Sequence, residues 1–233
     1  MKGTLYEHPK VYDSLYDDKD YAGEVAFVLD RFAAQGNGGD RALVVGCGTG
    51  RHSARLLEAG FQVTGIDPNP RMLASARNRS DATFREGGLP TVDVEGSFDL
   101  IWAPFTVMNY LDPHEFTPAV QAMDRTLAGG GIIVFDIGDF PVTDTPALQF
   151  ADGDDPVARI YWYRRPDNTH VRMDAIVFHG DEWFADRHTL TDYPTGVVAE
   201  YLRDLGFDVD VHDWYGTPTD MPNPAVLVAY DRA

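Results

Sequence analysis

The stretch that decides the fold is RALVVGCGTGRHSARLLEAGFQVTGID, residues 41–67. It opens with a short apolar run typical of a buried strand and passes through three glycines into a helical pattern that Gly60 ends. A second apolar run follows and ends on Asp67. Because two parallel strands need a crossover helix between them, this stretch predicts a strand–helix–strand unit with a glycine loop at its ligand-binding edge.

The spacing of the glycines indicates which ligand the loop suits. A dinucleotide-binding loop has a third glycine where the helix packs on the strand, and Arg51 occupies that place here. Pyrophosphate binding is therefore disfavoured. Gly46, Gly48 and Gly50 still let backbone N–H groups approach an amino-acid carboxylate or a ribose as well as a phosphate. Asp67 ends the second strand, where a carboxylate can accept hydrogen bonds from both hydroxyls of a ribose.

Strand and helix patterns alternate beyond this unit, which favours an α/β fold with a mostly parallel sheet covered on both faces. Further strands are expected at 82–87, 97–103, 129–138, 207–214 and 225–231, and helices at 70–78, from Pro113, and at 194–205. Between 156 and 190 the pattern changes to strands linked by turns. We expect this segment to form an antiparallel flap inserted after the fifth strand.

The charge of the chain restricts its partners. Its 233 residues hold 19 Lys and Arg against 37 Asp and Glu, a net charge of −18. Because nucleic-acid affinity comes largely from Lys and Arg neutralising phosphates, no nucleic-acid partner is expected. An acidic surface with only Lys2, Lys10 and Lys19 suits a protein that lives in concentrated salt, although a GC-rich genome would produce the same shortage of lysine.

The sequence contains no obvious membrane or disulfide element. No apolar run approaches the ~20 residues of a membrane span, and the N-terminus lacks the pattern of a secretory signal, so a cytoplasmic protein without membrane contact is expected. Cys47 is the only cysteine, which excludes an internal disulfide. The seven histidines show no metal-ligand spacing, so no metal site is expected. For the oligomeric state, both a monomer and a homodimer are compatible with the sequence.

Four motifs resemble those of the class I S-adenosylmethionine-dependent methyltransferases. They are VVGCGTG (44–50), GIDPNPRMLASAR (65–77), SFDLIWAPFTVMNYL (97–111) and RTLAGGGIIVFDIGDF (125–140). The resemblance implies a single Rossmann-like domain with a seven-stranded sheet, and S-adenosylmethionine as the cofactor, converted to S-adenosylhomocysteine. It covers nearly the whole chain, 1–233.

Segments near both ends resemble a narrower subgroup, which contains glycine N-methyltransferases and amino-sugar N,N-dimethyltransferases. These are YDSLYDDKDYAGEVAFV (12–28) and DRHTLTDYPTGVVAEYLRDLGFDV (186–209). The resemblance divides the domain into a helical lid, a donor-binding half, the flap, and a C-terminal helix with strands. Their expected bounds are 1–35, 41–138, 156–190 and 194–233.

The resemblance also implies which residues meet the cofactor. They are Tyr16, Tyr21, Gly46, Cys47, Gly48, Gly50, Asp67, Pro68, Met72, Gly88, Leu89, Ala103 and Phe105. Pro68 and Met72 would flank the adenine. Gly88 departs from the family, which usually has an acidic residue here for the adenine amine, so backbone groups or Glu86 would serve instead. Tyr12, Tyr16 and Tyr21 would either contact the donor carboxylate or only pack their helix down.

The methyl acceptor is expected over the fourth and fifth strands, because the donor occupies the ends of the first two. The catalytic candidates are Phe105, Asn109, Tyr110 and His188, and the predicted pocket wall adds Asp136 and Tyr161. His179 on the flap is a weaker candidate for a base, and His52 is expected to be structural or a neighbour of the donor. The expected reaction is methyl transfer to an N or O atom of a small molecule. Two alternatives remain open: a protein or nucleic-acid acceptor, and a non-catalytic module that senses the cofactor.

Overall fold

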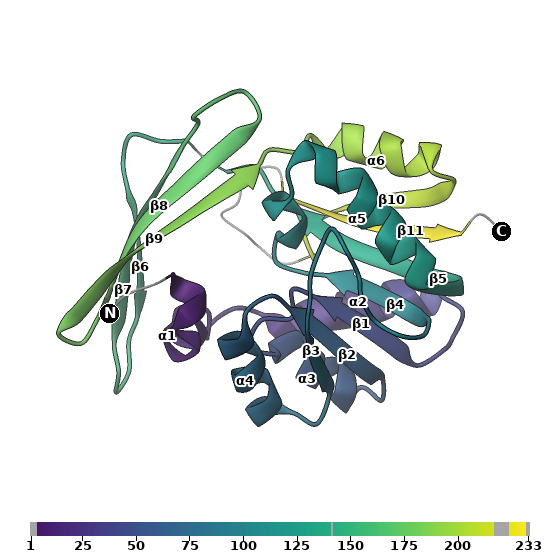
Figure 1. Cartoon of the computed structure of the whole chain (residues 1–233), viewed down its shortest axis with the longest axis horizontal. Helices are drawn as coiled ribbons and strands as arrows, with labels where there is room; N and C mark the ends of the chain where they lie inside the picture. Colours follow the sequence, from purple (N-terminus) through teal and green to yellow (C-terminus); the bar gives the residue numbers. More distant parts are fainter. Residues whose placement is uncertain (1–3, 141, 217–223, 232–233) are drawn as a thin grey trace.

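The computed structural model describes residues 4–140, 142–216 and 224–231. It contains a seven-stranded sheet with helices and, beside it, a four-stranded antiparallel sheet (Figure 1). The helices are η1 (Leu5–Glu7), α1 (Pro9–Leu15), α2 (Tyr21–Gln35), α3 (Arg51–Glu58), α4 (Pro70–Arg79), η2 (Val107–Tyr110), α5 (Pro113–Thr126) and α6 (Thr195–Asp204). The strands are β1 (Arg41–Val45), β2 (Gln62–Asp67), β3 (Thr83–Glu86), β4 (Phe98–Ala103), β5 (Leu127–Ile137), β6 (Ala147–Ala151), β7 (Val157–Arg164), β8 (His170–His179), β9 (Glu182–Thr191), β10 (Phe207–Asp213) and β11 (Ala225–Asp231).

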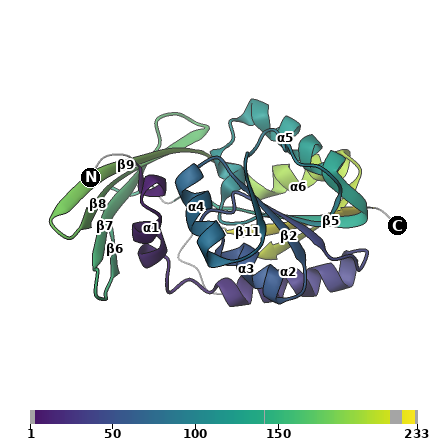
Figure 2. The same ribbon diagram turned by 60° about the horizontal axis from the view of Figure 1, so that its bottom comes forward.

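The large sheet has the strand order β10-β11-β5-β4-β1-β2-β3. Strands β1 to β5 pair in parallel, and β11 pairs antiparallel with both β5 and β10. Two buried apolar clusters lie on its two faces: α5 and α6 cover one face, and α2, α3 and α4 cover the other (Figure 2). The predicted fold, an α/β Rossmann-like sheet with an antiparallel flap after the fifth strand, is therefore confirmed.

Local chemistry explains where two helices begin. Asp112 and Glu115 form a capping box at α5, in which Glu115 Oε2 accepts a hydrogen bond from Asp112 N at 2.9 Å. Helix α3 follows Gly50, which has a left-handed φ of +81°. A Cβ at this position would lie 2.9 Å from the Cβ of Ala76 on α4, so only glycine fits between the two helices.

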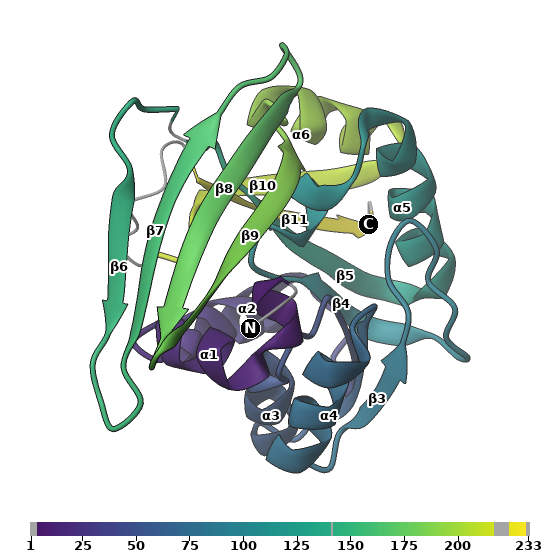
Figure 3. The same cartoon turned by 60° about the vertical axis from the view of Figure 1, so that its left-hand side comes forward.

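The flap consists of β6 to β9 and begins earlier than the expected 156–190, because β6 adds an edge strand from Ala147 that pairs with β7. Its inner face lies against α1 (Figure 3) and shares with η1 and α1 an apolar cluster that includes Leu5 and Val177. The expected lid, 1–35, divides in two: α1 packs against the flap, whereas the apolar face of α2 packs on the large sheet. Within the described ranges, no helix combines the length and apolar character needed to cross a membrane.

Candidate active site

A cavity of about 790 Å³ lies at the carboxyl ends of β1, β2 and β4, where the strand order reverses. This volume is within the ~300–1,000 Å³ range of small-molecule sites. Besides Arg51 and Glu86, thirteen of the residues singled out from the sequence line it. They are Tyr12, Tyr21, Gly46, Cys47, Gly48, His52, Asp67, Pro68, Met72, Gly88, Leu89, Phe105 and Tyr110.

The glycine loop and Asp67 form one side of this cavity. Gly46 has a φ of +65°, and a Cβ on it would lie 2.5 Å from a methyl group of Val107. Asp67 Oδ2 accepts a hydrogen bond from Gly48 N at 2.9 Å, and Oδ1 accepts one from Asn69 N at 2.8 Å. Burial raises the pKa of Asp67, and these two N–H donors oppose that shift. Each oxygen keeps a second lone pair, so the carboxylate can still accept two hydroxyl donors.

The loop after β3 lines the cavity next to Asp67, because Glu86 at the end of β3 pairs with Asp67 at the end of β2. Gly88, which stands where the resemblance predicts an acidic residue, lines the cavity together with Glu86. The backbone of Gly88 forms an isolated bridge with Thr91, which folds this loop back on itself. Backbone groups and the Glu86 side chain therefore both remain available at this edge.

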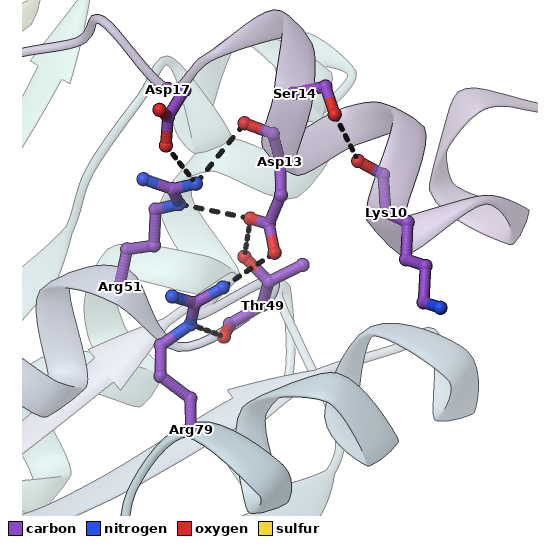
Figure 4. Close-up of polar contacts among 7 residues, drawn as sticks. All are labelled: Lys10, Asp13, Ser14, Asp17, Thr49, Arg51 and Arg79. Carbon is purple, nitrogen blue, oxygen red and sulfur yellow. Dashed lines mark hydrogen bonds and ion pairs between the residues drawn. The ribbon is translucent and has the colours of Figure 1, made fainter. Parts of the chain in front are cut away.

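A polar cluster ties the lid helix α1 to the glycine loop (Figure 4). Asp13 Oδ1 accepts hydrogen bonds from Thr49 Oγ1 at 2.6 Å and Arg51 Nε at 3.0 Å, and Oδ2 accepts one from Arg79 Nη2 at 2.5 Å. Arg51 also bonds Asp17 Oδ1 at 2.9 Å, and Arg79 Nε donates to the carbonyl of Thr49 at 2.8 Å. We call Asp13, Thr49, Arg51 and Arg79 the lid latch. The sequence offered no local signal for it, because its members come from α1, the loop, α3 and α4.

Asp136 has a different role from the predicted one, which placed it in the acceptor wall. Its side chain is fully buried and accepts hydrogen bonds from Phe105 N at 2.6 Å, from Thr106 N and from the hydroxyl of Tyr215. Phe105 and Thr106 have left-handed φ angles of +64° and +58°, which are strained for residues with a Cβ. Asp136 therefore holds the strained turn that directs Phe105 into the cavity. Burial raises its pKa to about 6.

Asn109 does not line the cavity, which corrects the prediction that it meets the acceptor. Its side chain is fully buried, where Nδ2 donates to the carbonyls of Thr191 at 2.8 Å and Gly138 at 3.2 Å. Both ends of the amide are used, since Oδ1 accepts from Gly138 N. His179 also lies away from the cavity, at the far end of the flap, where its Nε2 is 2.7 Å from Asp155 Oδ2. Asn109 thus joins the flap to the large sheet.

Aromatic side chains form the end of the cavity beyond the glycine loop. The hydroxyls of Tyr6 and Tyr110 are 2.6 Å apart, and burial raises the pKa of both phenols. His188 lies behind them, with its ring centre 5.1 Å from Tyr6 and 5.6 Å from Tyr110. Its Nε2 bonds Asp186 Oδ2 at 2.9 Å, and Asp186 Oδ1 accepts from Leu5 N. His188 therefore supports the aromatic wall rather than lining the cavity.

The remaining predicted residues also lie just behind the surface of the cavity. Tyr16 packs edge-on against Phe105, with ring centres 4.9 Å apart, and its hydroxyl accepts a hydrogen bond from Arg159 Nη1 at 2.9 Å. The guanidinium of Arg159 stacks over Tyr161, which places Tyr161 on the inner side of the flap. Ala103 is fully buried at the end of β4. These residues, and Gly50 before α3, were expected at the ligand surface, but none of them lines the cavity.

Cys47 and His52 line the cavity in surroundings that suppress their reactivity. Burial raises the pKa of the Cys47 thiol, which keeps it protonated and unreactive. His52 Nε2 bonds Glu24 Oε2 at 2.7 Å, and burial lowers the pKa of the ring. Glu24 is also paired with Lys19. In the part of the chain that the structure describes, no group of His, Cys, Asp and Glu side chains could hold a metal ion.

Comparisons with known proteins agree with this architecture. A family model described as "Methyltransferase domain" matches residues 42–131. A putative methyltransferase of Geobacillus sp. (strain WCH70) is 31% identical over 214 residues, which cover 85% of this chain and 86% of that protein. This chain belongs to the S-adenosylmethionine-dependent methyltransferases. The putative methyltransferase YqeM of Bacillus subtilis (strain 168) is also similar, at 27% identity over 85% of this chain and 84% of that protein.

Solved structures share nearly the whole fold. DesVI of Streptomyces venezuelae has a TM-score of 0.85 at 24% identity and covers 97% of this chain and 98% of its own. CalS10 of Micromonospora echinaspora, an amino pentose methyltransferase solved with S-adenosylmethionine bound, has a TM-score of 0.79 at 27% identity, over 95% of this chain and 97% of its own. The methyltransferase fold therefore includes the flap as well as the large sheet.

The residues of the cavity fit S-adenosylmethionine. A molecule with a ribose and a zwitterionic amino acid needs a group that accepts hydrogen bonds from the two ribose hydroxyls. It also needs a segment of backbone that can come close to the amino acid. Asp67 supplies the first, and the positive-φ glycines 46 and 48 supply the second. S-adenosylmethionine is thus the cofactor of this enzyme, and the assignment of individual contacts to it is a proposal.

Proposed function

We propose that this methyltransferase acts on an amino nitrogen of a small polar molecule of the amino-sugar class. The single observation that carries the proposal is the aromatic end of the cavity, where Phe105, Tyr6 and Tyr110 line the space beyond the glycine loop. The amino pentose methyltransferase CalS10 supports the same substrate class, because it matches this chain over nearly its full length, including the flap.

The chemistry of this wall favours nitrogen over oxygen as the acceptor. Bound S-adenosylmethionine supplies a methyl group on a cationic sulfur, and the acceptor must reach it in line. A hydroxyl acceptor needs a base, whereas a neutral amine is already a nucleophile. Tyr6 and Tyr110 bond each other, and their raised pKa values keep them un-ionised near neutral pH, so neither is an effective base. His52, also at the cavity, is held by Glu24.

The chain's own contribution is to position the reactants and exclude water. Holding two groups at a separation of ~3–3.5 Å in the correct direction can supply much of the rate enhancement. Phe105, fixed by Asp136, and the lid residue Tyr12 lie on the cavity surface. Their ring faces also attract cations, which suits both a sulfonium and a methylated ammonium product.

The two alternative functions are less well supported. A nucleic-acid acceptor is disfavoured by the net charge of −18, because such a chain repels the phosphates of a polynucleotide. A module that only senses the cofactor would not need cavity space beyond the glycine loop, yet the aromatic end at Tyr6 and Tyr110 provides it.

The test compares amino sugars with hydroxyl sugars of otherwise identical structure. Methyl transfer from S-adenosylmethionine is followed by mass spectrometry, which identifies the modified atom. We expect methylation of the amines and at least ~100-fold lower kcat/KM for the hydroxyl counterparts, as for an acceptor that lacks a base. Phe105→Ala and Tyr110→Ala should lower turnover far more than cofactor affinity. Equal methylation of the hydroxyl sugars would overturn the nitrogen assignment.

A further inference from the structure

The segment that carries Tyr110 to the cavity is attached to the flap on both sides of this residue. Before it, Asn109 Nδ2 donates to the carbonyl of Thr191 at 2.8 Å. After it, the carbonyl of Leu111 accepts hydrogen bonds from Thr191 Oγ1 at 2.6 Å and from the hydroxyl of Tyr193 at 2.8 Å. The position of Tyr110 therefore depends on how the base of the flap, where β9 ends, lies against the large sheet.

A histidine of the flap makes the next attachment along this segment. His170 is the first residue of β8 and pairs with Thr191 of β9. Its Nε2 lies 3.2 Å from Oδ1 of Asp112, the residue that caps α5. Its Nδ1 lies 2.9 Å from Oδ2 of Asp167 in the turn between β7 and β8. We call Asp112, Asp167 and His170 the flap clasp, because one imidazole joins a carboxylate of the flap to a carboxylate at the start of α5.

This arrangement requires a particular charge state of the histidine. An ionised carboxylate only accepts hydrogen bonds, and a neutral imidazole has a single N–H donor. Both contacts of His170 are therefore hydrogen bonds only when both ring nitrogens carry a proton. The hydrogen bond with Asp167 raises the pKa of His170 above its ordinary value, and the one with Asp112 adds to that shift.

The other charged groups at the base of the flap also favour the protonated form. Arg165, the cation of the same turn, is paired with Asp192 at 2.6 Å, and Asp192 lies within hydrogen-bonding reach of Asp139. On the α5 side, Glu115 belongs to the capping box and adds another negative charge. The charges around His170 are thus mainly negative, which stabilises an imidazolium.

We propose that His170 is a positioning residue whose proton closes the flap clasp and so holds Tyr110 in place for the acceptor. This inference rests on the proposed function, because it gives Tyr110 the acceptor as its ligand. A neutral His170 keeps one N–H donor, and the contact with Asp112 is the one expected to open. Asp167 stays beside the ring in any case, since it also accepts hydrogen bonds from the backbone N–H groups of Thr169 and His170.

The direction of the pH effect follows from the raised pKa. The clasp is complete below the ordinary histidine pKa of ~6.5, and it opens as the pH rises through the higher pKa of the folded protein. An amine acceptor also changes its protonation with pH. The quantity to measure is therefore the acceptor KM of a variant divided by that of the wild type at the same pH, in which the ionisation of the acceptor cancels.

His170→Gln tests the clasp in methylation assays with an amino sugar. Glutamine has one donor end and one acceptor end, like a neutral imidazole. We expect a KM ratio of ~3–5 at about pH 6, the size of a partly exposed ion pair, falling to about 1 at about pH 9. The affinity for S-adenosylhomocysteine should not change. His114→Gln is the matched control, because His114 is an exposed histidine of the first turn of α5 outside the clasp, and its ratio should stay at about 1. A KM ratio for His170→Gln that does not change with pH would overturn the proposal.

Amide hydrogen exchange tests the clasp without an acceptor. Residues 107–112 should exchange faster in His170→Gln than in the wild type at about pH 6, and equally fast at about pH 9. His170→Arg keeps its charge at about pH 9, so there these residues should exchange more slowly than in the wild type. If exchange follows this pattern but amino sugars are not methylated, the clasp stands and the proposed function fails. If the exchange difference is the same at both pH values, the clasp is wrong whatever the acceptor is.

Discussion

Asp13→Asn should open the lid latch and speed the release of the cofactor. Asp13 is the only anion that contacts both Arg51 and Arg79 among the described residues, and it also accepts from Thr49 of the glycine loop. Asparagine has the same shape but offers one acceptor oxygen, and its amide N–H₂ group would face a guanidinium. The attachment of α1 to the wall that holds the cofactor would then lose its two less exposed ion pairs and keep only the pair of Arg51 with Asp17, whose side chain is 74% exposed.

The expected size of the effect follows from the burial of these groups. The side chains of Asp13, Arg51 and Arg79 are 17%, 18% and 31% exposed, between a surface ion pair and a buried one. Exposed pairs contribute ~0–1 kcal/mol, and hydrogen bonds to charged groups ~1.5–3 kcal/mol. Because asparagine can keep the bond from Thr49, we expect a loss of about 2 kcal/mol in lid closure. This corresponds to an approximately 30-fold faster release.

Stopped-flow displacement of S-adenosylhomocysteine measures the release rate directly. Asp30→Asn is the matched control, because Asp30 also pairs with an arginine, Arg31, but lies on α2 and is exposed. Its release rate should equal that of the wild type. If Asp13→Asn releases the cofactor product no faster than Asp30→Asn does, the latch does not hold the lid. A thermal melt without ligand separates lid opening from general destabilisation.

Three further perturbations test the site and the surface. Asp67→Ala should weaken binding of S-adenosylhomocysteine by roughly 1.5–3 kcal/mol in calorimetry, as for a lost charged hydrogen bond, and unchanged affinity would remove Asp67 from the ribose site. Asp136 has a pKa of about 6 in the folded protein, above its ordinary value, so folding favours the protonated carboxyl. The free energy of unfolding should therefore be highest below about pH 4 and fall as the pH rises through about 6. Urea titrations should show this loss of up to ~3 kcal/mol in the wild type and not in Asp136→Asn. If the two proteins lose stability in parallel as the pH rises, the role assigned to Asp136 is refuted. If the net charge of −18 reflects adaptation to salt, the melting temperature should rise between low and molar KCl as self-repulsion is screened, whereas a flat curve points to genome composition.

The elements of the cofactor-binding half were predictable because their signals are local. Apolar runs bounded by glycines, and caps such as Asp112 with Glu115, fix where strands and helices start within a few residues. Strand β6 was missed because its apolar residues, Leu148 and Phe150, alternate over only five residues, which is a short signal. The outer side of that strand is also exposed, so its apolar residues do not mark a core.

The predictions that failed concern contacts between distant parts of the chain. Asn109 follows a strand that ends at the cavity, which made it a reasonable acceptor residue. Its amide is instead used by Gly138 and Thr191, the second of which lies 82 positions away. Asp136 was assigned to the cavity wall for the same reason, and it turned out to bond a backbone turn 30 residues earlier. Spacing along the sequence carries no information about such partners.

The same non-local contacts connect the two ends of the reaction site. Helix α1 is held to the glycine loop by Asp13, but its apolar side shares a core with the flap through Val11 and Leu15. The apolar contacts are the stronger link, because burying an aliphatic side chain is worth ~1.5–3 kcal/mol and the latch is partly hydrated. When the latch opens, α1 should therefore move with the flap and away from the loop. Tyr6 travels on the same segment and is the partner of Tyr110 at the aromatic end. Opening would thus uncover the cofactor and the acceptor together, so Asp13→Asn should raise the KM of the acceptor as well as the release rate of the cofactor.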